Sequence, residues 1–220
     1  MKTRFQISTL LMLCSLAVPF CAYAPGKASA APKHSHVHSD EAKSKIYQGY
    51  FETEQVKTRE LSDWAGKWHS VYPYLLDGTL DPVFKHKAEE GEKSFEDYRK
   101  YYELGYKTDV TKIVITDNSM AFTQGDKTYR GTYLSDGFEI LTYAKGNRGV
   151  RYIFKKADGD ASAPEYVQFS DHGITPEKSG HFHLYWGKDR KALLQEVTNW
   201  PTYYPWALNG KQVVREMLAH

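Results

Sequence analysis

The chain has 220 residues, of which 41% are hydrophobic, 15% aromatic and 25% charged. This length fits one domain with a substantial core, and the sequence contains no internal repeat and no low-complexity linker. The formal net charge of +2 includes three basic residues among the first thirty, so the remaining chain carries 26 basic against 27 acidic residues. That balance removes the main electrostatic argument for a nucleic-acid partner.

The first thirty residues have the layout of a secretory signal peptide. Lys2 and Arg4 precede the apolar stretch 7–20, and small residues follow it. The apolar stretch is shorter than the about 20 residues of a membrane-spanning helix. Of two candidate cleavage sequences, Ala22-Tyr23-Ala24 is followed by a proline, so we place the cut after Ala28-Ser29-Ala30. The sequence predicts an exported protein without a membrane anchor.

Both cysteines, Cys14 and Cys21, lie in this leader. The exported chain then has no thiol, so any metal site must use histidine and carboxylate ligands. Residues 31–39 are polar and lack periodic apolar positions, which predicts a flexible tail. Residues 40–220 are expected to form a single domain, and we expect a monomer.

Helical patterns lie at both ends of this domain. The spacing of apolar residues predicts helices over 40–54, from Asp81-Pro82 onward, and over 95–105, 189–199 and 211–218. Ser62 is suited to cap a short helical turn that includes Trp64 and Trp68. The aromatic stretch 200–206 is interpreted as packing of peripheral helices rather than as a surface that stacks on carbohydrate or nucleic acid.

The middle of the chain reads as β-structure. Short apolar runs separated by turn residues predict seven strands, over 112–116, 120–124, 127–134, 138–143, 150–154, 166–170 and 181–186. Gly125-Asp126 and Asp136-Gly137 are examples of the turn residues between them. Closely spaced strands with short connections indicate an antiparallel meander, open or closed into a barrel. The predicted fold class is α+β, mainly antiparallel β.

Three histidines form the most informative pattern. Successive side chains of a strand point to opposite faces, so His181 and His183 share a face. Their Cβ atoms are expected to lie about 6.5–7 Å apart. His172 ends the preceding strand, and a short connection returns the chain antiparallel, so its side chain can reach the same ion. Three neutral imidazoles suit zinc, copper, nickel or cobalt and fit calcium or magnesium badly. The alternative is a set of polar residues on a wet sheet face.

Other candidate ligands are weaker. Asp171 is a fourth ligand, a hydrogen-bond acceptor for a liganding imidazole, or a turn residue, and strand alternation favours the turn. His34, His36 and His38 alternate on the predicted tail and form a possible secondary metal site or the fourth ligand of the main one. The remaining histidines, at 69, 86 and 220, are interpreted as surface or packing residues.

Several motifs together resemble the ZinT (YodA) family of periplasmic zinc- and cadmium-binding proteins. They are Leu61-Ser62-Asp63-Trp64-x-Gly66-x-Trp68, Ser70-Val71-Tyr72-Pro73, Leu80-Asp81-Pro82-Val83-Phe84, Gly149-Val150-Arg151-Tyr152, Gln168-Phe169-Ser170-Asp171-His172, His181-Phe182-His183 and Asn199-Trp200-Pro201-Thr202-Tyr203-Tyr204-Pro205. The resemblance implies a lipocalin-like β-barrel flanked by helices, with a buried metal held by His172, His181 and His183. It also implies zinc acquisition, binding of cadmium and other divalent ions, and cooperation with the substrate-binding protein of a zinc ABC transporter.

Two functions remain open for the trio. A scavenger or metallochaperone would bind zinc and pass it to a transporter component, without catalysis. A zinc-dependent hydrolase or hydro-lyase would use the fourth coordination position to activate water. No H-E-x-x-H motif or paired carboxylate adjoins the three histidines, which favours binding over turnover. A third alternative, a lipocalin-type carrier of a small organic ligand, is supported only by the aromatic content.

Overall fold

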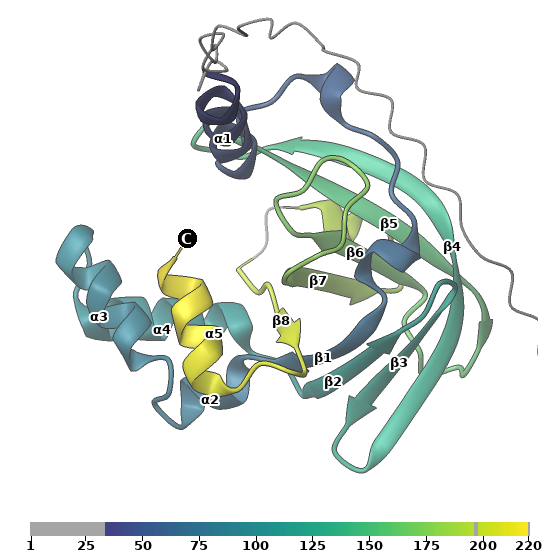
Figure 1. The fold of residues 1–220 in the computed structure, drawn as a ribbon. Coiled ribbons are helices and arrows are strands. Elements are labelled where there is room, and N and C mark those ends of the chain that lie inside the picture. Colours follow the sequence, from purple (N-terminus) through teal and green to yellow (C-terminus); the bar gives the residue numbers. More distant parts are fainter. Residues whose placement is uncertain (1–33, 196–197, 220) are drawn as a thin grey trace, which may run out of the picture.

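The computed structural model describes residues 34–195 and 198–219 and contains a closed barrel of antiparallel strands (Figure 1). Each strand pairs with the next along the chain, and the last pairs with the first. The strands are β1 (Gly66–Ser70), β2 (Val110–Ile115), β3 (Ser119–Gln124), β4 (Lys127–Thr142), β5 (Arg148–Gly159), β6 (Tyr166–Ser170), β7 (Phe182–Gly187) and β8 (Thr202–Pro205). Closure leaves the sheet without exposed edges.

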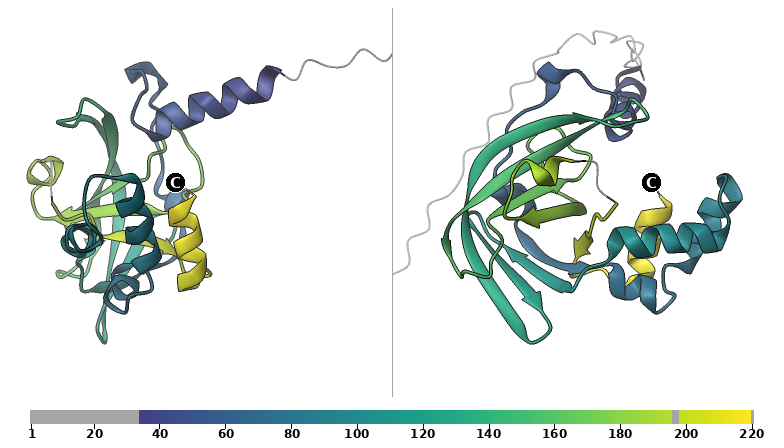
Figure 2. Two further views of the ribbon diagram at one scale, coloured as in Figure 1. Left: turned by 90° about the vertical axis from the view of Figure 1, so that its left-hand side faces the viewer. Right: turned by 180° about the vertical axis from the view of Figure 1, so that it is seen from behind.

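Helices lie outside the barrel. They are α1 (His34–Tyr47), α2 (Tyr72–Leu76), α3 (Asp81–Glu90), α4 (Phe95–Tyr106) and α5 (Gly210–Leu218), with short 3₁₀ helices η1 (Thr53–Gln55), η2 (Leu61–Trp64) and η3 (Ala192–Leu194). Helices α2 to α5 form a layer on one side of the barrel, while α1 lies apart from them (Figures 1 and 2). Within the described part of the chain, no helix has the length and apolar character needed to cross a membrane.

The barrel wall separates two apolar cores. The inner core fills the barrel with aromatic side chains, and alternation along β7 and β8 sends Phe182 and Tyr203 into it. The next residue, Tyr204, faces outward and packs into the second core, which joins the barrel to the helical layer. That second core consists of Val71, Leu75, Leu80, Val83, Phe84, Tyr106, Tyr204 and Val213. The outer face of β7 and β8 therefore looks toward the helices.

The predicted lipocalin-like barrel with flanking helices is confirmed, but the prediction missed two of its strands. Trp64 and Trp68 suggested one helical turn because they are four residues apart. In the structure η2 ends at Trp64, and Trp68 lies in β1 opposite Ile113 of β2 and Pro205 of β8. These pairings join distant segments, which no local pattern reveals.

Two predicted strands, 127–134 and 138–143, are one long strand. The predicted turn at Asp136-Gly137 is instead an irregularity within β4, where the register with β5 shifts between Ser135 and Phe138. Gly137 has φ of +81°, a conformation that a glycine adopts readily inside such a bulge. The bulge bends β4 without ending it.

One predicted helix has different bounds in the structure. Helix α1 begins at His34, inside the stretch expected to be an irregular tail, and ends at Tyr47 instead of Glu54. Residues 41–45 are exposed, so this part of the helix has no apolar face to detect. The helix stops because Gly49 adopts φ of +89° against the backbone of Arg148, where a Cβ would lie 2.4 Å from its carbonyl oxygen.

The helix predicted over 189–199 is wrong for the described residues, which contain only η3. The Asp189 carboxylate accepts hydrogen bonds from the backbone N–H groups of Lys191 and Ala192, which forms a short turn. Farther on, the Asn199 side-chain amide donates to three carbonyls at the end of α4, including that of Gly105. The Asn199 contacts are tertiary, so no pattern within 189–199 could indicate them.

Candidate metal centre

The three predicted histidines converge. His172 lies in the loop after β6, His181 immediately precedes β7, and His183 lies within β7. Their ring centroids are 5.8–6.0 Å apart, an almost equilateral triangle. One ring nitrogen from each lies within 4.8 Å of the others. Nitrogens around a tetrahedral zinc ion are about 3.4 Å apart, given bonds of about 2.0–2.1 Å, so small ring movements would bring all three onto one ion.

Strand geometry explains why the trio lies on the outer wall of the barrel. Phe182 points into the inner core and is fully buried, so His181 and His183 on either side of it face outward. Ser170 of β6 pairs with His183 of β7, which places the loop after β6 beside the trio. His172 is the one described non-glycine residue with a positive φ, 65°, and this left-handed conformation turns the chain at the site.

Two of the histidine rings, those of His172 and His181, each stack on a tyrosine ring. The His172 ring stacks on Tyr47 at 4.3 Å, and its Nδ1 lies 3.2 Å from the Tyr47 carbonyl oxygen. His181 stacks on Tyr204 at 5.0 Å with the planes 7° apart. Tyr47 belongs to α1 and Tyr204 to β8, so the rings are positioned by segments far apart in the sequence.

A residue of the adjacent strand holds the His183 ring. Its Nδ1 lies 2.8 Å from the hydroxyl oxygen of Thr202 on the neighbouring strand β8. Desolvation lowers the pKa of His183 well below its ordinary value, and the positive charges of His172, His181 and Arg151 lower it further. The neutral imidazole is the form that binds metal, so this environment favours the liganding state.

Two cavities meet at the trio. One, of about 540 Å³, lies between α1 and the barrel and is lined by His172, His183 and Tyr185 among others. The other, of about 350 Å³, lies between the barrel and the helical layer, and all three histidines line it together with Lys87. The described residues that line these cavities include no Asp or Glu. Among the His, Cys, Asp and Glu side chains of the described residues around these cavities, the group that comes together is the three histidines.

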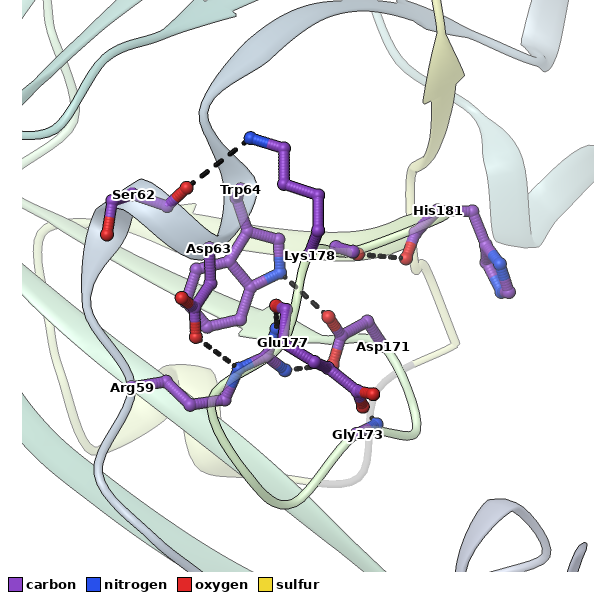
Figure 3. Close-up of polar contacts among 10 residues, drawn as sticks. Arg59, Ser62, Asp63, Trp64, Asp171, Gly173, Glu177, Lys178 and His181 are labelled. Carbon is purple, nitrogen blue, oxygen red and sulfur yellow. Dashed lines mark hydrogen bonds and ion pairs between the residues drawn. The ribbon is translucent and has the colours of Figure 1, made fainter. Parts of the chain in front are cut away.

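Asp171 belongs to a different cluster, on the far side of the loop from the histidines. One carboxylate oxygen accepts hydrogen bonds from the Arg59 guanidinium (2.7 Å) and the Gly173 N–H (3.2 Å), and the other accepts from the Trp64 indole N–H (3.0 Å). Figure 3 shows this cluster, with the His181 ring turned away from it. Of the alternatives left open for Asp171, the structure favours the turn residue.

Arg59 links this loop to the segment before the barrel. Its side chain is fully buried and pairs with Asp63 (2.9 Å) and Asp171, and it also donates to the Glu177 carbonyl (2.8 Å; Figure 3). The Ser179 N–H donates to the Asp63 carbonyl at 3.0 Å. The loop that ends at His181 is thus fastened at several points to η2.

The histidines outside the trio stay apart from this centre, lie outside the described residues, or have side chains that the structure does not describe. His69 packs between Tyr74 and Trp206, and His86 lies 3.4 Å from Glu90 on α3. His220 lies outside the described residues, as does the leader. The backbone over His34, His36 and His38 is helical, but the structure does not describe their side chains, so the secondary site stays a prediction.

Sequence reasoning did not find the residues that orient the trio. Tyr47 was placed in a longer helix, and Thr202 and Tyr204 were assigned only to an aromatic packing stretch. The one available signal was the motif Asn199 to Pro205, which marked this stretch without indicating its partner. Pairing of β8 with β7 brings Thr202 to His183, and that register is not readable locally.

Fold and site together define a lipocalin-like barrel with a candidate metal centre on its outer wall. A family model described as "ZinT (YodA) periplasmic lipocalin-like zinc-recruitment" matches residues 42–220, and the chain belongs to this family. The resemblance drawn from the motifs is therefore confirmed.

Named relatives agree with this assignment. The chain is 58% identical to the probable metal-binding protein YrpE of Bacillus subtilis over 182 residues, covering 82% of this chain and 72% of YrpE. It is 53% identical to the zinc-binding lipoprotein AdcA of Streptococcus pneumoniae, covering 80% of this chain but only 35% of AdcA. The chain thus corresponds to about a third of that longer protein.

Solved structures extend the comparison to the fold. Zn(II)-bound AdcA from Streptococcus pneumoniae superposes with a TM-score of 0.77 at 53% identity, covering 80% of this chain and 38% of that one. The Zn(II)-bound ZinT-like domain of the same protein superposes with a TM-score of 0.76 at 52% identity, covering 79% of this chain and 97% of the domain. The similarity therefore spans nearly the whole of that domain.

Proposed function

We propose that this protein recruits zinc outside the cytoplasm by binding it through His172, His181 and His183. The observation that carries this proposal is the convergence of three imidazoles, with nitrogens within 4.8 Å of one another, on a fold of the zinc-recruitment family. Neutral nitrogen donors suit Zn²⁺, and the same set would accept Cd²⁺, Ni²⁺, Cu²⁺ or Co²⁺. Relatives named as zinc-binding proteins support zinc as the principal ion.

The site suits reversible binding more than turnover. A zinc hydrolase needs a general acid or base beside the metal-bound water, and a carboxylate is the usual group. Neither cavity has an Asp or Glu among its described lining residues. The relatives are named for binding metal. We therefore propose a binding protein rather than the hydrolase or hydro-lyase considered from the sequence.

We further propose that the bound ion passes to the substrate-binding protein of a zinc transporter. Support comes from AdcA, a zinc-binding lipoprotein in which a ZinT-like domain is one part of a longer chain. A signal peptide cleaved after Ala30 would deliver the protein to the periplasm, in agreement with the family description. Mixing zinc-loaded protein with a purified substrate-binding protein and following the ion by mass spectrometry tests this transfer.

Calorimetric titration with Zn²⁺ tests the site itself. The variants His172→Ala, His181→Ala and His183→Ala should each lose tight binding, whereas His86→Ala, on the exposed face of α3, should bind like the wild type. A protein with His34, His36 and His38 all changed to Ala separates the N-terminal histidines from the main site. Tight binding that survives the triple change of residues 172, 181 and 183 would show that the ion is held elsewhere. Zinc-dependent ester hydrolysis that the same change abolishes would restore the enzyme alternative.

A further inference from the structure

We propose that Thr202 is a positioning residue of the metal centre, which fixes His183 to bind its ion through Nε2. This inference rests on the proposed function, because it concerns the same site. Thr202 lies on β8 directly opposite His183 of β7, and its side chain is buried. Its hydroxyl therefore reaches the imidazole from within the wall of the barrel, away from solvent.

The direction of the hydrogen bonds follows from the partners. The Thr202 hydroxyl lies 2.9 Å from the Trp200 carbonyl oxygen and 2.8 Å from His183 Nδ1. A carbonyl oxygen only accepts, so the single hydroxyl proton of Thr202 is donated to Trp200. The bond to His183 must then run the other way, with Nδ1–H donating to the hydroxyl oxygen. In a neutral imidazole this leaves the lone pair on Nε2, the nitrogen available to an ion.

Trp200, whose carbonyl accepts the Thr202 hydroxyl proton, is itself held in place. The Trp200 N–H donates to the Gly105 carbonyl at the end of α4 at 2.6 Å. The Trp200 ring lies against Gly105 so closely that a Cβ there would be 2.3 Å from the ring, which only glycine permits. The chain of contacts therefore runs from the helical layer through Trp200 and Thr202 to His183.

The position of the ring proton on His172 follows from the same reasoning, with a different acceptor. Its Nδ1 faces the Tyr47 carbonyl, another group that only accepts, so Nδ1 carries the proton and Nε2 again remains for the ion. Two of the three histidines are thus oriented by acceptors placed behind them. The Tyr47 acceptor belongs to the backbone and persists in side-chain variants, so Thr202 offers the direct test. Removing such a partner of a liganding histidine typically weakens metal affinity 10–100-fold.

The test compares Thr202→Val, which keeps the shape and removes the hydroxyl, with Thr202→Ser, which keeps the hydroxyl. Thr123→Val is the matched control, since the partner of the Thr123 hydroxyl among the described residues is Thr128 on the neighbouring strand β4. Zinc affinity by calorimetry should fall about 10–100-fold in Thr202→Val and stay within about threefold of wild type in Thr202→Ser and Thr123→Val. Near-ultraviolet circular dichroism confirms the fold of each variant.

Nitrogen-15 NMR of the metal-free proteins supplies a readout that packing alone would not change. His183 should show the Nδ1–H tautomer in the wild type and Thr202→Ser, and a mixture of tautomers in Thr202→Val. Equal affinities, an unchanged tautomer in Thr202→Val, or failure of Thr202→Ser to restore binding would overturn the assignment of Thr202. A wild-type protein that does not bind zinc at all would instead overturn the proposed function.

Discussion

Arg59 and Asp171 are 112 residues apart in the sequence and form an ion pair of 2.7 Å, with almost no solvent access to either side chain. The pair fastens the loop that carries His172 to the segment before β1. Asp171 is adjacent to a proposed metal ligand, yet its carboxylate binds Arg59, Trp64 and the backbone of Gly173. We therefore expect the geometry of the proposed metal centre to depend on a charge cluster that includes none of its three histidines.

Replacing Asp171 with Ala should destabilise the protein by roughly 3 kcal/mol, because loss of one partner leaves the other charge buried. The value lies at the lower end of the range since Asp63 still pairs with Arg59. Urea unfolding of the metal-free protein measures this difference. The control is Asp136→Ala, which removes a more exposed pair with Arg190 and should cost less than about 1 kcal/mol. Equal losses of unfolding free energy in the two variants would mean that the buried pair stabilises the protein no more than the exposed pair does.

His172 is held in a left-handed conformation that only glycine adopts without strain. Its φ of 65° costs a side-chain-bearing residue roughly 1–2 kcal/mol. His172→Gly should therefore be more stable than His172→Ala by about 1 kcal/mol, while neither variant should bind zinc tightly. Thermal unfolding of both metal-free variants checks the difference. A more stable alanine variant would show that the backbone relaxes when the imidazole is removed.

The stability of the metal-free protein should fall as the pH drops below about 6.5. Desolvation lowers the pKa of His183 well below that value, the ordinary pKa of histidine. From pH 6.5 down to the lower folded-state pKa, the unfolded chain binds a proton that the folded protein does not, so acid favours unfolding. Unfolding free energies at pH 5.5, 6.5 and 7.5 measure the slope. The variant His183→Gln should lose less stability over this range, and an identical slope would refute the assignment to His183.

Local patterns predicted most strands because their turns and alternation lie within a few residues. They failed where pairing is non-local, since β1 and β8 are defined by partners elsewhere in the barrel. They also failed at Gly137, where the same residue type serves a turn or a bulge, and only the register with β5 decides between them.

For the candidate site, too, local patterns predicted one part, the three histidines, and missed another, the groups that orient them. Alternation alone placed His181 and His183 on one face, and the short connection brought His172 near. The groups behind the rings, the Tyr47 carbonyl and the Thr202 hydroxyl, come from α1 and β8. Neither carries a sequence signal, because any residue supplies a carbonyl and threonine is common in strands.

Arg151 should weaken zinc binding. Its side chain is 2% exposed, its Nε and Nη1 have no hydrogen-bond partner among the described residues, and its guanidinium lies 3.3 Å from the centre of the Tyr185 ring. Its charge contributes to the lowered pKa of His183, so its field reaches the imidazole proposed to hold the ion. The same field opposes a divalent cation, and a weakly held ion is easier to pass on.

Arg151→Met should therefore bind zinc at least about tenfold more tightly, because a unit charge and a divalent ion less than about 20 Å apart repel by more than about 1.4 kcal/mol at an effective dielectric constant near 20. Competition with a zinc-chelating dye measures the affinity. Lys127→Met, at the exposed β3–β4 hairpin, removes the same charge far from the site and should change the affinity little. Constant affinity in Arg151→Met would mean that the Arg151 charge does not act on the ion, and a lower affinity would mean that this arginine helps to retain it.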